Sequence, residues 1–579
     1  MTNEWAAGGT GAEARGAPID GFDGVRYGGG RVRQVGGGMS RLALLGDSAV
    51  DERGLAGALP AVAAGRWEEL TRWPGSYWVI ARNATAVFVC GDLAGIRPVY
   101  YSPRGGPGRW ATDSRRLGQP LVPDLPWLTA QLVVGAQHWP DRTPHEDVRL
   151  VPGGFGLLLT ADGQLQLVDV SGIVKAADLR SGAAAFGQAL TDAIRHRVVA
   201  ADGRASADLS GGLDSSTAVL LAAESGDVHA VTYTDAYTSA EDTSFAQRVA
   251  DRAGVRHTLT RGGPQQLPFR FPAAERAGCE PVLAHANWPM DSAYLDAVAG
   301  LPLHLTGHGG DVVLDASTAC WVRLLQDGHL RAAHREVVAF ARLRSIAPGG
   351  YWRAVKEAAS LGHTGTVERV ADDLDRRRAA PRAVGGWSWC RPGPSAAWLT
   401  EEGRQHVAAL LRQAARTQEH TRADEFDQWS ALRAMGSSAR GWLPCAAALA
   451  LRPVHPYLDN QVVRAAFAVP ALARRGVTTY KPLLPAALPR LPGWLTSRRS
   501  KGSFTAQRIA GLDRHHSRLR EVIGASPLVA SGLIDAASAH TALAQAARGQ
   551  NPSVIPDVHQ LLVICWWLSE RRGAWETAC

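Results

Sequence analysis

A glycine- and serine-rich segment near the middle of the chain, DLSGGLDSSTAVLLAA at residues 208–223, has the composition of an anion-binding turn. The pattern predicts a strand that ends at Ser210, a tight turn at Gly211 and Gly212, and a helix beyond it. Glycine lets the backbone turn sharply and approach a ligand closely. Free N–H groups and the positive end of the helix dipole would then favour an anion at the turn.

Asp214 lies inside this predicted anion site, where its carboxylate would repel a phosphate group. A cation between the two removes the repulsion, and Mg²⁺ binds both carboxylate and phosphate oxygens. No lysine follows the glycines, so the segment differs from the G-x-x-x-x-G-K-S/T loop that handles the γ-phosphate in kinases and GTPases. The nucleotide-binding residues that this segment predicts are Leu209, Ser210, Gly211, Gly212, Asp214, Ser215 and Ser216.

Strand-like and helix-like stretches alternate around this segment. Residues 181–200 have apolar side chains at helical spacing, residues 227–234 predict a strand, and residues 241–254 predict another helix. Such alternation predicts an α/β fold, with a parallel sheet and helices on both faces. Ligands bind such sheets at the carboxyl ends of the strands, where the strand order reverses.

The composition narrows the class of protein. At 579 residues the chain is too long for one core, and 46% hydrophobic with 20% charged residues is typical of globular proteins. The net charge of +8 comes from scattered basic residues without a Lys/Arg block, so we expect no nucleic-acid partner. A binding groove for an acidic peptide explains the basic excess equally well.

Cysteine usage and hydropathy predict a cytoplasmic protein without a membrane partner. The seven cysteines form no C-x-x-C pair, which favours neither a zinc site nor a disulfide framework and agrees with a reducing compartment. The N-terminus lacks the basic and apolar regions of a signal peptide. The apolar run LLVICWW near the end is far too short to span a membrane.

SGGLDSS resembles the pyrophosphate-binding loop of the ATP pyrophosphatase superfamily, whose members cleave ATP to AMP and pyrophosphate and adenylate a carbonyl oxygen. A second segment, LHLTGHGGDVVL at residues 303–314, resembles the G-x-G-x-D motif of that superfamily. The resemblance implies ATP and Mg²⁺ as cofactors, with Asp214 and Asp311 as metal ligands that neutralise the leaving pyrophosphate. It also implies nucleotide contacts at Thr234, Thr306 and Gly307.

The first part of the chain carries a resemblance of its own. Residues 21–170 are strand-like, and GDLAGIRPVYYSPRGGPGRWATDSRRL within them resembles the glutaminase domain of asparagine synthetases, an N-terminal-nucleophile β-sandwich. That family has Cys directly after the initiator Met, whereas this chain has Thr2, and the family's Asn-Gly-Glu segment is absent. A threonine nucleophile is chemically feasible. Without the thiolate and the glutamine-holding groups, however, we expect a degenerate glutaminase-like domain over residues 1–172.

The remainder, residues 173–579, is then expected to form an asparagine synthetase-like ATP-binding domain. This domain would have a Rossmann-like parallel sheet with extra helices, and it would come after the α+β N-terminal part in the chain.

His308 departs from the family pattern. Asparagine synthetases have Glu at this position and β-lactam synthetases have a Tyr that pairs with Glu, so the resemblance places His308 near the attacking amine. A histidine can accept a proton from that amine at neutral pH. The alternative is a turn histidine that hydrogen-bonds the backbone. We assign no acidic partner to His308. The candidates are Asp424, Glu425 and Asp427, which are equally explained as solvated residues on the exposed face of a helix.

Segments after residue 450 resemble the last part of asparagine synthetases, among them HPYLDNQ, YKPLLP and SRRSKGSF. The resemblance implies that Lys501, in a basic loop, reaches the α-phosphate and the developing pyrophosphate, as a catalytic residue together with His308 and Asp214. An ordinary basic surface loop is the alternative for Lys501. Lys481, at a predicted helix start, is a second candidate that either binds phosphate or caps the local structure.

The C-terminal part, with SGLIDAASAHTAL and a closing WWL helix, resembles lasso-peptide macrocyclases, which are asparagine-synthetase homologues without a working glutaminase. The resemblance implies ATP-dependent closure of an isopeptide ring between the α-amine of a core peptide and an Asp or Glu side chain. It also implies a leader-binding protein and a leader peptidase as partners. The alternatives are an asparagine synthetase or β-lactam synthetase-like amide ligase that acts on a small amino acid, and a non-catalytic peptide-binding scaffold.

Overall fold

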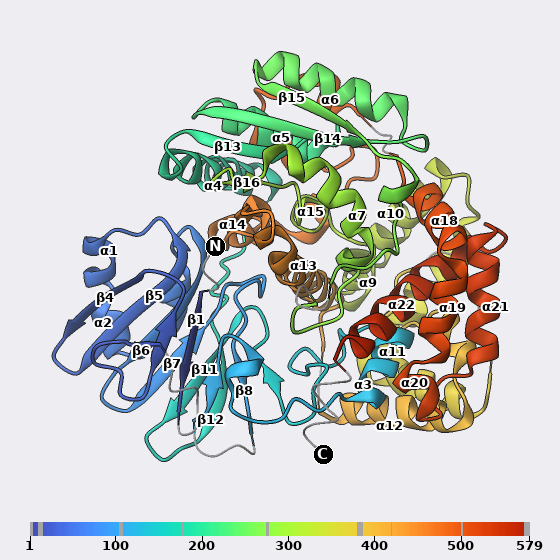
Figure 1. The fold of residues 1–579 in the computed structure, drawn as a ribbon, viewed down its shortest axis with the longest axis horizontal. Coiled ribbons are helices and arrows are strands. Elements are labelled where there is room, and N and C mark those ends of the chain that lie inside the picture. Colours follow the sequence, from blue (N-terminus) through green and yellow to red (C-terminus); the bar gives the residue numbers. More distant parts are fainter. Residues whose placement is uncertain are drawn as a thin grey trace.

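The computed structural model describes residues 4–9, 16–103, 108–176, 178–273, 277–378, 386–417, 420–498 and 502–571. Within them the chain is a mixed α/β structure with two six-stranded antiparallel sheets and one five-stranded parallel sheet. In Figure 1 the two antiparallel sheets lie together on one side, the parallel sheet lies above them, and helices fill the rest. None of the described helices is both long enough and apolar enough to cross a membrane.

The N-terminal strands form two sheets that share a core. The strands are β1 (Trp5–Gly8), β2 (Ala17–Pro18), β3 (Arg26–Gly28), β4 (Val32–Gly37), β5 (Ser40–Ser48), β6 (Gly75–Arg82), β7 (Ala86–Cys90), β8 (Tyr100–Tyr101), β9 (Trp110–Ala111), β10 (Arg149–Leu150), β11 (Phe155–Thr160) and β12 (Leu165–Asp169). Their orders are β10-β8-β9-β1-β3-β2 and β12-β11-β7-β6-β5-β4. Alternate side chains of a strand share one face, so Ala6 and Trp110 of the first sheet meet Leu45 and Ile80 of the second in one buried cluster.

The predicted parallel sheet is confirmed, with the order β15-β14-β13-β16-β17. Its strands are β13 (Arg204–Asp208), β14 (Asp227–Thr234), β15 (Arg256–Arg261), β16 (His304–Leu305) and β17 (Pro453–Val454), and the helices before and between the first of them are α4 (Leu179–Ala200), α5 (Leu213–Ala223) and α6 (Ala240–Ala253). The chain runs from β13 to β14 and β15 on one side and later adds β16 and β17 on the other. The strand order therefore reverses at β13, which is where α/β sheets bind ligands.

Helices dominate the rest of the chain. They are α7 (Ala284–Leu295), α8 (Gly310–Val313), α9 (Ala319–Gln326), α10 (Leu330–Leu343), α11 (Pro348–Asp375), α12 (Glu401–Thr417), α13 (Ala423–Ala447), α14 (Asn460–Ala468), α15 (Ala471–Arg474), α16 (Leu483–Ala487), α17 (Gly493–Thr496), α18 (Thr505–Arg514), α19 (His516–Gly524), α20 (Pro527–Ala530), α21 (Ala536–Ala547) and α22 (Ile555–Ser569). Between β9 and β10 the chain also forms α3 (Leu125–Val134).

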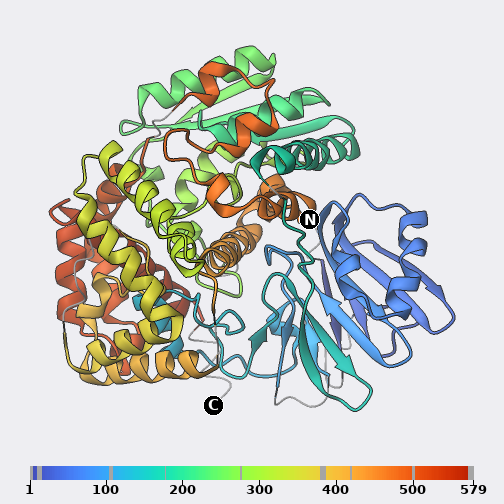
Figure 2. The ribbon, with the colours of Figure 1, turned by 180° about the vertical axis from the view of Figure 1, so that it is seen from behind.

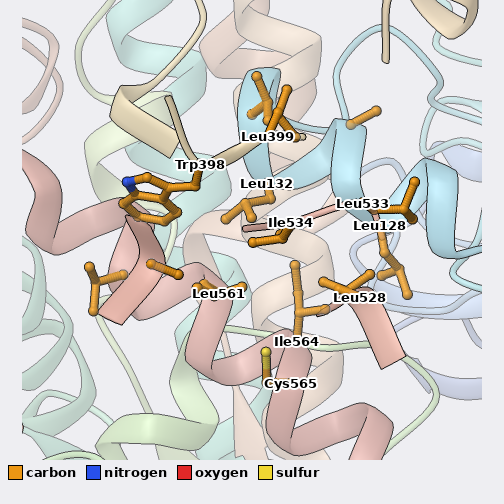
Figure 3. Packing of buried hydrophobic residues seen from close by; sticks show 14 of the residues in the cluster. Leu128, Leu132, Trp398, Leu399, Leu528, Leu533, Ile534, Leu561, Ile564 and Cys565 are labelled. Atoms are coloured by element: carbon orange, nitrogen blue, oxygen red, sulfur yellow. The ribbon is translucent and has the colours of Figure 1, made fainter. Parts of the chain in front are cut away.

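Helix α3 packs with the C-terminal helices although it precedes them by far in sequence. Figure 3 shows Leu128 and Leu132 of α3 beside Leu528 of α20 and Leu561 and Ile564 of α22. These side chains are buried in one cluster, so the N-terminal part of the chain contributes to the core of the helical region.

Helix α13 lies at the centre of the molecule, between the antiparallel sheets and the parallel sheet in both views (Figures 1 and 2). A Cβ at Gly436 would come within 1.9 Å of the Ala94 carbonyl oxygen, so the turn after β7 approaches the helix backbone closely. Arg433 Nε donates to the Gly153 carbonyl oxygen at 3.0 Å. The antiparallel sheets are therefore fixed directly to the helix that also borders the site described next.

Candidate functional site

The turn between β13 and α5 has the predicted glycine-dependent shape. Gly211 has φ +74°, and a Cβ there would lie 2.3 Å from the Asp242 carbonyl oxygen of α6. No residue with a side chain fits that position without moving the backbone. The Ser210 N–H donates to Ser215 Oγ at 3.1 Å and so links the two ends of the turn.

The first turn of α5 begins at this place without a side-chain cap. Gly212 is the N-cap residue, and no side chain caps the helix there. The first N–H groups of any helix have no partner within it. The Ser216 N–H donates to the Gly212 carbonyl oxygen at 3.1 Å and so closes the first helical hydrogen bond. The uncapped turn at Asp214 and Ser215 has the dipole direction of an anion site.

A second glycine turn, between β16 and α8, packs directly on the first. A Cβ at Gly307 would lie 2.7 Å from the Ser215 nitrogen, and a Cβ at Gly310 would lie 2.4 Å from Asp214 Cγ. Both positions therefore require glycine because of close approach. The two motifs, about a hundred residues apart in sequence, form one surface at the carboxyl edge of the parallel sheet.

Lys481 joins the two acidic residues of these turns. Its Nζ lies 2.7 Å from each carboxylate oxygen of Asp214 and 2.6 Å from Asp311 Oδ1. The Lys481 side chain is 3% exposed, that of Asp214 10% and that of Asp311 67%. Burial opposes the positive charge, but the two carboxylates outweigh it and raise the pKa of Lys481 above its ordinary value. A single cationic group thus lies between the two predicted metal ligands.

Asp214 and Asp311 also fit a Mg²⁺ ion. Because one Nζ touches both carboxylates at 2.6–2.7 Å, their oxygens converge on one point from two separate turns. Over the described ranges, no group of three or more His, Cys, Asp or Glu side chains has the spacing of a metal site. Mg²⁺ typically takes one or two carboxylates and completes its shell with phosphate oxygens and water. These two residues are therefore the ones that would hold the ion.

The other predicted nucleotide contacts lie along the same sheet edge. The Leu209 N–H donates to the Val231 carbonyl oxygen at 2.8 Å, which joins the turn to β14. Thr234 is the last residue of β14. Thr306 follows β16, and its Oγ1 lies 2.7 Å from His455 Nδ1. Leu209 and Thr306 thus border the two glycine turns, and Thr234 lies at the end of the neighbouring strand.

His308 makes the contact that the backbone alternative predicts. Its Nε2 donates to the Met435 carbonyl oxygen of α13 at 3.0 Å, and its own N–H donates to Thr306 Oγ1 at 3.2 Å. Burial lowers the pKa of His308, and the Met435 carbonyl, Asp208 and Asp311 act in the opposite direction. The neutral ring therefore has its lone pair on Nδ1, which is the atom that can accept a proton.

The three acidic candidates for a His308 partner lie elsewhere. Asp424, Glu425 and Asp427 are in the first turns of α13, and the nearest of them is eight residues, or about 12 Å of helix, from Met435. Asp208 is the residue that sequence reasoning missed: it is the last residue of β13, and its charge opposes the effect of burial on the pKa of His308. It begins the segment at residues 208–223, but only the fold brings its charge close to His308.

Two predicted residues, Thr2 and Lys501, lie outside the described residues. The sequence patterns do not single out Arg498, which shares the basic run RRSKG with Lys501. The Arg498 guanidinium donates to the Gly211 carbonyl oxygen, pairs with Asp242 and lies 4.2 Å from the Phe245 ring centroid. Arg498, the basic residue of this run that the structure describes, therefore contacts the first glycine turn.

The family model for asparagine synthase matches residues 185–569, which include both glycine turns, His308 and Lys481. The chain belongs to this family. No curated protein gives a significant match.

Among solved structures, NMN synthetase from Francisella tularensis is 19% identical over 13% of this chain and 33% of its own, with a TM-score of 0.13. A glutamine phosphoribosylpyrophosphate amidotransferase from B. subtilis, complexed with ADP and GMP, is 11% identical over 57% of this chain and 72% of its own, with a TM-score of 0.17. The chain thus spans about a third of the first structure, and TM-scores this low do not establish a shared arrangement.

Asp214, Asp311 and Lys481 all lie within the residues that the family model matches. The arrangement combines an uncapped helix N-terminus, a buried ammonium and two carboxylates that can share a divalent ion. Such a set can bind a triphosphate and stabilise the negative charge that develops when its terminal part leaves.

Proposed function

We propose that the chain is an ATP-dependent, AMP-forming carbon–nitrogen ligase that closes a ring in a leader-free core peptide. An Asp or Glu side chain of the peptide is adenylated, and the peptide α-amine then forms an isopeptide bond with it. The observation that carries the proposal is the meeting of Asp214, Asp311 and Lys481 at the start of α5, inside the region shared with the family.

In the first step a peptide carboxylate oxygen bonds to the α-phosphorus of ATP, and the bond from that phosphorus to the β-bridging oxygen breaks. The first N–H groups of the uncapped helix α5 would donate to phosphate oxygens, and Lys481 would supply positive charge beside them. Bound Mg²⁺ would neutralise part of the charge on the leaving pyrophosphate. Removing one such charge contact typically costs about a hundredfold in rate.

In the second step the α-amine attacks the activated carbonyl carbon, AMP leaves with its oxygen, and the nitrogen gives up a proton. Nδ1 of His308 is the acceptor that we assign to that proton, since Nε2 is engaged with the Met435 carbonyl. The peptide loses one water overall. Holding both ends of one peptide together supplies most of the acceleration, because the attack becomes unimolecular.

The choice of a peptide over a small amino acid rests on the C-terminal resemblance and on two departures from asparagine synthetases. Thr2 replaces the cysteine that releases ammonia, and His308 replaces the glutamate of the small-substrate site. The proposal includes a leader-binding protein and a leader peptidase as partners in the cytoplasm.

Mass spectrometry of the linear core peptide after incubation with ATP and Mg²⁺ tests the proposal. The expected product is one water lighter and resists aminopeptidase, and Asp214→Asn should reduce its formation by about a hundredfold or more. Asp251→Asn, on the exposed side of α6, is the matched control and should leave the rate unchanged. Pyrophosphate release that depends on aspartate and ammonia, without ring formation, would favour the small-substrate alternative instead.

A further inference from the structure

A second site candidate lies away from the glycine turns, in a cavity of about 810 Å³ between the antiparallel sheets and the helices. One wall is α13, through Phe426, Trp429 and Arg433, and the opposite wall includes Phe155 of β11 and Trp139. The size is that of a pocket for a small organic ligand or a few amino-acid residues.

Arg433 is a partly buried cation on the wall of this cavity. Its Nε donates to the Gly153 carbonyl oxygen at 3.0 Å, and its guanidinium lies 5.4 Å from the Trp429 ring centroid and 5.7 Å from that of Phe155. None of the ion pairs among the described residues includes it. Burial lowers the pKa of Arg433 to about 10, with Asp169 acting in the opposite direction, so the side chain is still charged at neutral pH.

A partly buried charge that forms no close ion pair loses part of its hydration, and the two rings offset only part of that cost because neither carries a formal charge. Three acidic residues, Asp141, Asp169 and Glu425, also line the cavity, and two of them have polar partners of their own. Asp169 Oδ1 accepts from the Ser171 N–H at 2.7 Å, and Glu425 pairs with Arg422 at 3.1 Å. The cavity thus combines a fixed cation that forms no close ion pair with aromatic walls.

Helix α13 contributes both to the wall of this cavity and, through Met435, to the contact with His308. Arg433 lies two residues, or about 3 Å of helix, before Met435, whose carbonyl oxygen binds His308. The α13 residues that line the cavity begin at Glu425, about 15 Å before Met435. An extended peptide of about four residues covers that length.

We propose that this cavity binds a carboxylate of the peptide substrate other than the one that is activated, with an aromatic or apolar side chain of the peptide against Trp429 and Phe155. This proposal rests on the proposed function for the identity of the ligand as a peptide. The carboxylate comes either from the peptide C-terminus or from a second acidic side chain, and both present the same planar pair of oxygens to a guanidinium.

Direct binding tests the cavity without any turnover. The probes are N-acetyl-phenylalanine, N-acetyl-phenylalaninamide and N-acetyl-phenylalanyl-glutamyl amide, titrated by calorimetry against the full chain. The first or third probe should bind about tenfold more tightly than the neutral amide, and which of them does so identifies the source of the carboxylate. Equal affinity of all three probes, or no binding of any, would overturn the proposal.

Arg433→Met should abolish the preference for the carboxylate probes, and Arg433→Gln, which keeps a donor for the Gly153 carbonyl, should do the same if the methionine variant folds poorly. Arg422→Met is the matched control, because Arg422 lines the same cavity but is paired with Glu425. It should keep the preference. If both Arg433 variants still prefer the carboxylate probes over the neutral amide, a group other than Arg433 binds the carboxylate, and the proposal is overturned.

The ring-closure assay separates the two proposals. If the chain makes the ring, Arg433→Gln should raise the KM for the peptide about tenfold and leave the KM for ATP unchanged. Ring closure with an unchanged peptide KM would overturn the cavity assignment and leave the proposed function standing. If the unaltered chain binds the carboxylate probes but closes no ring, the proposed function is overturned and the cavity assignment stands.

Discussion

Replacing Lys481 by a residue without an ammonium group should make the stability of the protein depend on Mg²⁺. In Lys481→Met, Asp214 and Asp311 face each other without a cation. Breaking a buried ion pair costs about 3 kcal/mol or more, and this value applies to Asp214, whose side chain is 10% exposed. The contact with the 67% exposed Asp311 adds less than about 1 kcal/mol. We therefore expect a loss of about 3 kcal/mol, or about 2–3 °C in the unfolding midpoint of a chain this long.

Differential scanning fluorimetry in a chelator and in millimolar Mg²⁺ measures this effect. The midpoint of Lys481→Met should be lower than that of the unaltered chain in the chelator, and Mg²⁺ should restore most of the difference, because the ion replaces the ammonium between the carboxylates. Lys175→Met is the control, since Lys175 Nζ donates to the Phe467 carbonyl oxygen at 3.0 Å instead of to a carboxylate. A Lys481→Met midpoint equal to that of the unaltered chain, with the same Mg²⁺ response, would refute the reasoning.

In chemical denaturation, Gly211→Ala should destabilise the protein by about 1–3 kcal/mol more than Gly254→Ala. Both glycines have positive φ, but only a Cβ at Gly211 would clash with the backbone. Equal losses of stability would contradict the close packing of the turn. Burial, followed by the charge of Asp208, raises the pKa of Asp291 to about 7. Between about pH 4 and pH 7 the folded state then keeps a proton that the unfolded state loses, so stability falls as pH rises. Asp291→Asn should remove up to about 4 kcal/mol of that fall in stability. The variant should then unfold at a higher temperature than the unaltered chain above pH 7, but at the same temperature at acid pH. A difference between the two midpoints that does not change with pH would disprove the assignment. His308→Ala should slow ring closure about a hundredfold while single-turnover pyrophosphate release is retained, and unchanged closure would remove His308 from the mechanism.

Local features of the site were predictable from the sequence. The turn at Gly211, the helix α5 after it and the second turn at Gly310 each depend on a few consecutive residues, whose backbone preferences are visible in the pattern. The alternation of strands and helices predicted the parallel sheet. The proximity of Asp214 and Asp311 was implied by the resemblance of the two glycine segments to the ATP pyrophosphatase superfamily, and Lys481 contacts both carboxylates.

Contacts between distant segments were not predictable in the same way. His308 and Met435 are 127 residues apart, and the bond between them depends on how α13 crosses the sheet. The sequence ranked Lys501 above Lys481, because a basic run is a stronger local signal than one lysine beside a proline. Burial of an isolated charge such as Arg433 has no local signature, because it depends on what packs around the side chain.

The sequence by itself thus determined that an anion-binding turn with two acidic residues lies at the edge of a parallel sheet, because glycine and aspartate impose their geometry locally. Only the tertiary structure decided that Lys481, 267 residues after Asp214, is the cation between them. The reason is physical: an ion pair requires two groups within about 4 Å, and that separation is set by the packing of α5, α8 and the segment before α16 rather than by any run of residues.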